Sequence, residues 1–168
     1  MAPGTLIKDV TIRPLNPKDY TDIATCCTEL AGMIPDLEKD IASGRVFGVV
    51  ASYASMCIGA VLAILDVDAS MAGEPLPLPC VRVLFIEVNK HYRGKGIGKL
   101  LMEKFIQQQN SKKIASITAS LFKTYKEGSK FFEQLGFQKE KMERNKIVLK
   151  MSLWSDFGVI DLPDEEIT

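Results

Sequence analysis

The chain has 168 residues, of which 46% are hydrophobic and 25% are charged, as in an ordinary folded domain. Lysine plus arginine and aspartate plus glutamate both total 21, so the net charge is zero. This balance argues against a protein that works on nucleic acid or on an anionic membrane, because both kinds of binding depend on excess positive charge. We expect one domain over residues 1–168, with its core over about 11–153 and a tail over 155–168.

The start of the chain and its cysteines favour a cytoplasmic protein without metal. There is neither a run of about 18 apolar residues nor a secretory signal. No cysteine pair has C-x-x-C spacing, and the single histidine, His91, stands beside no cysteine. We therefore expect no metal site, and four reduced thiols packed as small hydrophobic groups. These are Cys26, Cys27, Cys57 and Cys80.

The first third of the chain predicts a strand, two helices and a β-hairpin. Residues 11–15 form the strand, and the turn signal Asn16-Pro17 ends it. Apolar spacing then predicts a helix from Pro17 to about Gly32, followed by a short helix over residues 35–42 that stops at Gly44. The β-rich runs 46–52 and 56–67 predict a hairpin with its turn at 53–55.

The rest of the chain predicts strands that alternate with helices. Residues 81–88 (VRVLFIEV) are almost continuously apolar, which is typical of a central strand covered on both faces. A helix over 97–108, a strand over 114–121, a helix over 123–135 stopped by Gly136, and a last strand over 146–154 follow. The order β-α-α-β-β-β-α-β-α-β predicts an α+β (mixed α/β) fold with helices on both faces of a mixed sheet.

The segment between the central strand and the next helix carries the clearest functional signal. Three glycines alternate with other residues just before the helix begins, so backbone N–H groups and the positive end of the helix can approach an anion closely. Four cations surround this bend although the whole chain is neutral, which favours a discrete polyphosphate ligand. The alternative is a solvated basic turn without a ligand. The cations are Lys90, Arg93, Lys95 and Lys99.

The spacing of this segment excludes two common phosphate motifs and fits a third. Neither G-x-x-x-x-G-K-[ST] nor G-x-G-x-x-G occurs, but Arg93, Gly96 and Gly98 form R-x-x-G-x-G. The stretch IEVNKHYRGKGIGKLLMEKF resembles the acetyl-CoA-binding motif of the GNAT superfamily of N-acetyltransferases. The resemblance follows the element order from about residue 11 to 153, and it is specific over about 81–137. It implies a GNAT-like acyl-CoA N-acyltransferase fold with acetyl-CoA as the cofactor.

The resemblance also implies which residues bind the cofactor. The amides from Arg93 to Gly98 should hold the pyrophosphate, and the backbone of Glu87 and Val88 should pair with the pantetheine arm as an added strand would. The expected cofactor-binding residues are Val88, Arg93, Gly94, Lys95, Gly96, Ile97, Gly98, Lys99 and Phe132.

The chain departs from the family pattern at the position of the general acid. Family members often have a tyrosine where Phe132 stands, and that tyrosine reprotonates the departing thiolate. Phenylalanine has no proton to give, and Tyr125 stands seven residues earlier, where many members have an asparagine. We expect Tyr125 or water to act as the acid; the alternative is that Tyr125 is a surface or packing residue.

Glu87 is the expected general base. A lysine-like amine with a pKa of about 10.4 requires about 4.6 kcal/mol to lose its proton at pH 7, so a base is useful. Glu87 lies inside the apolar strand, where a carboxylate needs a purpose or a partner. The alternatives are that Glu87 meets solvent or Arg82, and that Asp66 or Asp68 is the base.

The expected reaction is direct attack of a primary amine on acetyl-CoA in a ternary complex. The amine could be a small molecule, a lysine side chain or a protein N-terminus, and its site is expected around residues 29–40 and 67–79. The alternatives are a non-catalytic acyl-CoA-binding sensor and a nucleotide- or RNA-binding module. The resemblance leaves a homodimer open.

Overall fold

The computed structural model describes residues 8–28, 34–67 and 78–154. These residues pack as two compact units. The first lies within residues 1–64 and 83–107, and the second within 65–82 and 108–168. Among the described residues, no helix combines the length and the apolar character that crossing a membrane requires.

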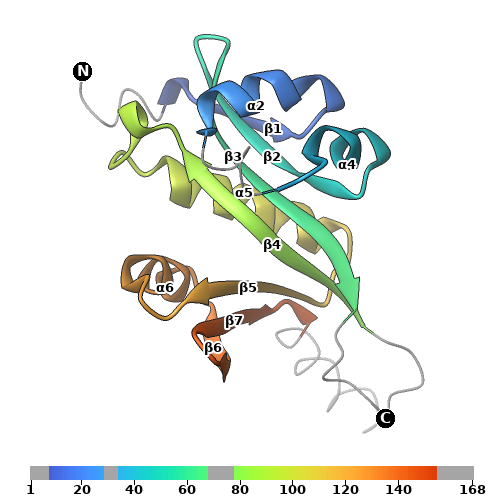
Figure 1. Cartoon of the computed structure of the whole chain (residues 1–168), viewed down its shortest axis with the longest axis vertical. Coiled ribbons are helices and arrows are strands. Elements are labelled where there is room, and N and C mark those ends of the chain that lie inside the picture. The colour runs from blue at the N-terminus through green and yellow to red at the C-terminus, as the bar shows by residue number, and fades with distance from the viewer. Residues whose placement is uncertain (1–7, 29–33, 68–77, 155–168) are drawn as a thin grey trace, which may run out of the picture. The chain divides into compact units, whose positions relative to one another are not determined.

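The first unit is built on the strands β1 (Thr11–Pro14) and β2 (Val46–Tyr53) and on the larger parts of β3 (Met56–Val67) and β4 (Pro79–Val88), which neighbour one another in that order (Figure 1). β1 pairs with β2, and β2 with β3, in antiparallel register. The predicted hairpin is confirmed, but its turn contains two residues, Ala54 and Ser55, with φ of 52° and 66°. A two-residue turn with both φ angles positive matches the twist of the paired strands.

The helix predicted from Pro17 to Gly32 is shorter in the structure. A 3-10 turn, η1 (Pro17–Asp19), leads into α2 (Tyr20–Cys26), and Asn16 caps the turn. Cys27 leaves the helical conformation with φ −115° and ψ 72°, and it is fully buried. Residues 29–33, and with them Leu30, lie outside the described residues. The second helix, α4 (Leu37–Ser43), ends at Gly44 as predicted, with φ 84°.

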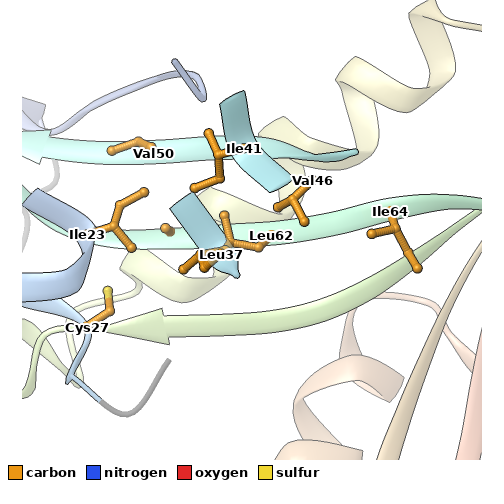
Figure 2. Close-up of a cluster of buried hydrophobic side chains, with 9 residues drawn as sticks. Ile23, Cys27, Leu37, Ile41, Val46, Val50, Leu62 and Ile64 are labelled. Atoms are coloured by element: carbon orange, nitrogen blue, oxygen red, sulfur yellow. The ribbon is translucent and has the colours of Figure 1, made fainter. Parts of the chain in front are cut away.

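Helices cover both faces of the sheet in the first unit, as predicted. On one face, side chains of α2 and α4 pack against alternate residues of β2 and β3; Figure 2 shows Ile23, Leu37 and Ile41 beside Val50 and Leu62. On the other face, a Cβ atom added to Gly59 of β3 would lie 3.2 Å from Cδ1 of Leu101 in α5 (Ile97–Ser111). Of the predicted apolar stripe of α5, Ile97, Leu101 and Phe105 are buried and Leu100 is half-buried.

The second unit contains an antiparallel group of three strands, with β7 (Lys146–Ser152) between β5 (Ser116–Phe122) and β6 (Gln138–Glu143). Its helix, α6 (Lys126–Gln134), is stopped by Gly136 at φ 107°, as predicted. The predicted order lacks β6. All six residues of β6 are exposed and five are polar, so no apolar alternation marks this strand in the sequence. Backbone pairing with β7 makes it a strand.

A bidentate ion pair fixes the entry into η1. The Arg13 guanidinium donates to both carboxylate oxygens of Asp19, at 2.7 Å and 2.8 Å. The backbone N–H of Asn16 donates to the same carboxylate at 2.8 Å. These hydrogen bonds, the Arg13 one above all, hold the pKa of Asp19 below its usual value against the opposing effect of burial. The ionised form of Asp19 therefore stabilises the fold.

Replacing Asp19 with asparagine should lower the free energy of unfolding at pH 7 by about 1–3 kcal/mol, because the charged hydrogen bonds between Arg13 and this buried carboxylate are lost. Because the folded-state pKa of Asp19 is lowered, this stabilisation is present above the unfolded-state value of about 3.9 and disappears as pH falls through the folded-state pKa. Urea unfolding of wild type and Asp19→Asn should therefore differ at pH 7 and converge in acid.

The more exposed pair of Asp40 and Arg45, at 3.4 Å, provides a control. Asp40→Asn should cost less than about 1 kcal/mol. Equal losses for the two variants at pH 7 would contradict a special role for Asp19.

Candidate functional site

The bend between β4 and α5 has the backbone geometry of an anion site. The chain leaves β4 through a short 3-10 turn, η3 (Lys90–Tyr92), and Gly94 and Gly96 then adopt left-handed φ angles of 76° and 84°. A side chain is disfavoured at such angles, whereas glycine adopts them freely. α5 starts directly afterwards, and Leu100 N–H donates to Gly96 O at 3.1 Å. The N–H groups of the first helical turn ahead of Leu100 have no intrahelical acceptor, so they are suited to bind an anion.

Asn89 connects this bend to two other elements of the first unit. Its backbone N–H donates to Ile58 O of β3 at 2.8 Å. Its side-chain Nδ2 donates to Cys26 O at the end of α2 at 3.1 Å, and its Oδ1 accepts from His91 N–H at 3.0 Å. The side chain and the backbone of Asn89 therefore connect the start of the bend to β3, to the end of α2 and to η3. Sequence reasoning did not single out Asn89, although an asparagine just before a turn is a familiar capping signal.

The Arg93 side chain turns back towards the end of β4. Its Nε donates to Val88 O at 2.7 Å, and its Nη2 lies 3.5 Å from Glu87 Oε2. Glu87 is buried, with 8% of its surface exposed, so Arg93 partners a carboxylate that has little access to water. The alternative partner considered for Glu87, Arg82, lies 3.3 Å from Asp66 instead. Asp68 lies outside the described residues.

The remaining cations of the bend are accessible. Lys90 and Lys99 are exposed, and Lys95 is half-buried. The structure thus brings the predicted cofactor-binding residues 88 and 93–99 together in one bend of the first unit. The backbone carbonyls expected to pair with the pantetheine arm have contacts of their own: Val88 O accepts from Arg93, and the Cys27 thiol donates to Glu87 O at 3.8 Å. A carbonyl has two lone pairs, so each can accept a second hydrogen bond.

The two aromatic residues predicted to act at the site belong to the second unit. Phe132 is 2% exposed and packs edge-to-face with Phe131 and Phe137, at ring-centre distances of 5.3 Å and 5.1 Å. Tyr125 is 56% exposed at the start of α6, and its ring covers Gly128: a Cβ added there would lie 2.5 Å from Tyr125 Cε2. Contact of Phe132 with the cofactor and acid catalysis by Tyr125 stay predictions.

A pocket of about 490 Å³ opens in the first unit beside the start of the bend. Its walls come from α2, the β2–β3 hairpin and η3, and include Cys26, Cys57 and Asn89. Of the four cysteines predicted to be small packing groups, Cys26 and Cys57 are partly accessible here, whereas Cys27 and Cys80 are buried. The acceptor is expected around residues 29–40 and 67–79. Within these two regions, residues 29–33 and 68–77 lie outside the described residues.

Comparison with known proteins identifies the family of this chain. A family model described as an acetyltransferase (GNAT) domain matches residues 43–139, more than half of the chain. A comparison with curated proteins finds no match.

Solved structures share the fold at low sequence identity. NAA60 of Arabidopsis thaliana, solved with acetyl-CoA, is 14% identical with a TM-score of 0.70, over 86% of this chain and 98% of that chain. The ribosomal-protein-S18-alanine N-acetyltransferase of Escherichia coli is 20% identical with a TM-score of 0.64, over 86% and 94%. An aminoglycoside acetyltransferase from an uncultured soil metagenomic sample, solved with sisomicin, is 16% identical with a TM-score of 0.68, over 83% and 95%. Because the family model covers more than half of the chain, the chain belongs to the GNAT family, the N-acetyltransferases that use acetyl-CoA as their acetyl donor.

Proposed function

We propose that this enzyme transfers the acetyl group of acetyl-CoA to a primary amine by direct attack in a ternary complex, and that the bend between β4 and α5 holds the cofactor pyrophosphate. The observation that carries the proposal is the pair of left-handed glycines, Gly94 and Gly96, directly before the first turn of a 15-residue helix. Three or four charged hydrogen bonds at about 1.5–3 kcal/mol each would supply much of the roughly 8 kcal/mol that micromolar binding needs.

In this proposal Arg93 organises the bend, and the backbone amides bind the phosphates. The Arg93 guanidinium is engaged with Val88 O and the Glu87 carboxylate, which ties the bend to the end of β4. The amides of residues 93–98 then need little rearrangement to bind the pyrophosphate. An arrangement formed before the ligand arrives reduces the entropy cost of binding.

The chemical step needs an unprotonated amine, a polarised thioester and a proton for the departing sulfur. The amine nitrogen attacks the thioester carbon, the carbon–sulfur bond breaks, and coenzyme A leaves as a thiolate that Tyr125 or water protonates. Glu87 accepts the proton of the amine, directly or through water. Holding the amine and acetyl-CoA in one complex lowers the activation barrier further, because their encounter becomes intramolecular.

The acceptor is proposed only as a class. The structurally similar enzymes named above include one that acts on ribosomal protein S18 alanine and one that acts on aminoglycosides. Both protein N-termini and small amines are therefore candidates, as are lysine side chains. A non-catalytic acyl-CoA sensor is the second candidate, because Phe132 leaves the usual tyrosine position without a proton donor.

The protein should be incubated with acetyl-CoA and a panel of amines, and the release of the coenzyme A thiol measured. The panel contains peptides with free N-termini, lysine peptides and aminoglycosides. We expect at least one class to raise thiol release well above hydrolysis, with the acetylated amine visible by mass spectrometry. Tight acetyl-CoA binding with no turnover of any amine would instead favour the sensor.

Gly96→Ala should weaken acetyl-CoA binding at least tenfold, measured by calorimetry, because alanine disfavours φ 84° and distorts the amides of the bend. Gly44→Ala is the matched control: Gly44 has the same φ of 84°, with open space around it, but caps α4. The two variants should lose similar stability while only Gly96→Ala loses affinity. Equal affinities would contradict the assignment of the pyrophosphate site.

Glu87→Gln separates the two proposed roles of this carboxylate, as the general base and as the ion-pair partner of Arg93. If Glu87 is the base, kcat falls at least tenfold and the KM for acetyl-CoA changes little. Asp66→Asn, the other carboxylate considered, should keep most of the activity. A Glu87→Gln enzyme with normal kcat and raised KM for acetyl-CoA would show that Glu87 serves only to hold Arg93.

A further inference from the structure

Three of the four cysteines form one cluster in the first unit. Cys26 Sγ lies 3.2 Å from Cys27 Sγ and 3.4 Å from Cys57 Sγ. Cys26 ends α2, and Cys57 lies at the start of β3, so the cluster joins segments far apart in the sequence. Cys26 and Cys57 line the pocket of about 490 Å³, whereas Cys27 is fully buried and its thiol donates to Glu87 O of β4.

We propose that Cys26 and Cys57 form a dithiol modification site, which a peroxide converts into a disulfide between the end of α2 and the start of β3. The reacting atoms are nearly in place, because a disulfide needs an S–S distance of about 2.05 Å and the two sulfurs start at 3.4 Å. Both residues are partly exposed through the pocket, which admits a molecule as small as hydrogen peroxide.

The geometry favours this pair over the neighbouring pair of Cys26 and Cys27. Adjacent residues in a trans peptide have Cα atoms about 3.8 Å apart, below the range of about 4.4–6.8 Å that disulfides normally span. A bond between Cys26 and Cys27 would therefore strain the end of α2. Cys27 is also closed to solvent, whereas Cys57 shares the accessible wall of the pocket with Cys26.

The step balances with a peroxide as the two-electron oxidant. One sulfur attacks a peroxide oxygen, the O–O bond breaks, and water leaves, so that this cysteine becomes a sulfenic acid. The second sulfur attacks the sulfenic sulfur, the S–S bond forms, the S–O bond breaks, and a second water leaves. Two thiols and one hydrogen peroxide give one disulfide and two waters, and each sulfur gives up one electron.

The surroundings of the thiols set how readily the site reacts. The hydrogen bond with Cys27 raises the pKa of Cys26 to about 12, and hydrogen bonding with Cys26 and burial raise the pKa of Cys57 further from its usual value. Both sulfurs are therefore protonated at neutral pH, and because thiolates are the reactive form, the pair stays reduced unless oxidant is sustained.

The experiment compares the full chain before and after hydrogen peroxide at mildly alkaline pH. The number of free thiols should fall from four to two, and peptide mapping should find Cys26 joined to Cys57. Dithiothreitol should restore all four. Because the bond closes a loop of 30 intervening residues, the oxidised form should unfold at a temperature roughly 5–10 °C higher.

Single variants test the pairing. Cys57→Ala and Cys26→Ala should each abolish both the disulfide and the thermal shift, whereas Cys27→Ala and the control Cys80→Ala should keep both. A disulfide that survives in Cys57→Ala, or a wild-type chain that loses thiols without a link between Cys26 and Cys57, would overturn the proposal. Peptide mapping of the oxidised wild-type chain tests the pairing even if a variant fails to fold.

Discussion

The hydrogen bonds that gather at the carboxyl end of β4 are the constraint on which the candidate site depends. β4 ends at Val88, whose carbonyl accepts from Arg93, and Asn89 then bonds to β3, to α2 and to the turn that follows. The two glycines of the bend have great conformational freedom on their own. Because both the strand end and the start of the turn are fixed, that freedom is confined to a few residues in front of α5.

The charged residues at the carboxyl end of β4 differ in role, because one cation forms an ion pair within the fold and two others are exposed. Arg93 lies against a buried carboxylate of its own chain, while Lys90 and Lys99 extend into solvent. An arginine suits the first role because its planar group can donate to a carbonyl while it forms an ion pair with a carboxylate. The exposed lysines suit long-range attraction of a polyphosphate, an effect that salt would screen.

Local signals explain which features the sequence predicts correctly. Gly44 and Gly136 stop their helices because glycine accepts left-handed dihedrals, and the stripe of Ile97, Leu101 and Phe105 follows helical periodicity. The bend is equally local, since strand, glycines and helix follow one another without interruption. These features need no knowledge of distant contacts, and the structure confirms them.

The features that sequence reasoning missed depend on contacts that apolar spacing does not show. β6 is a strand only because β7 offers its backbone, and α2 stops at Cys26 where the next cysteine packs against the end of β4. Asn89 and the cluster of Cys26 with Cys57 join residues more than 30 positions apart. The partner of Glu87 was missed for another reason: Arg93 lies only six residues away, but its side chain folds backwards, which spacing does not reveal.

The hydrogen bond from Asn89 to the Cys26 carbonyl has a thermodynamic consequence for the enzyme. Any displacement of the end of α2 must either break that bond or carry the start of the bend with it. With acetyl-CoA bound at the bend, as proposed above, a molecule that shifted α2 would alter the affinity for acetyl-CoA, and acetyl-CoA would alter the affinity for that molecule by the same factor. One asparagine side chain would then make two binding equilibria reciprocal.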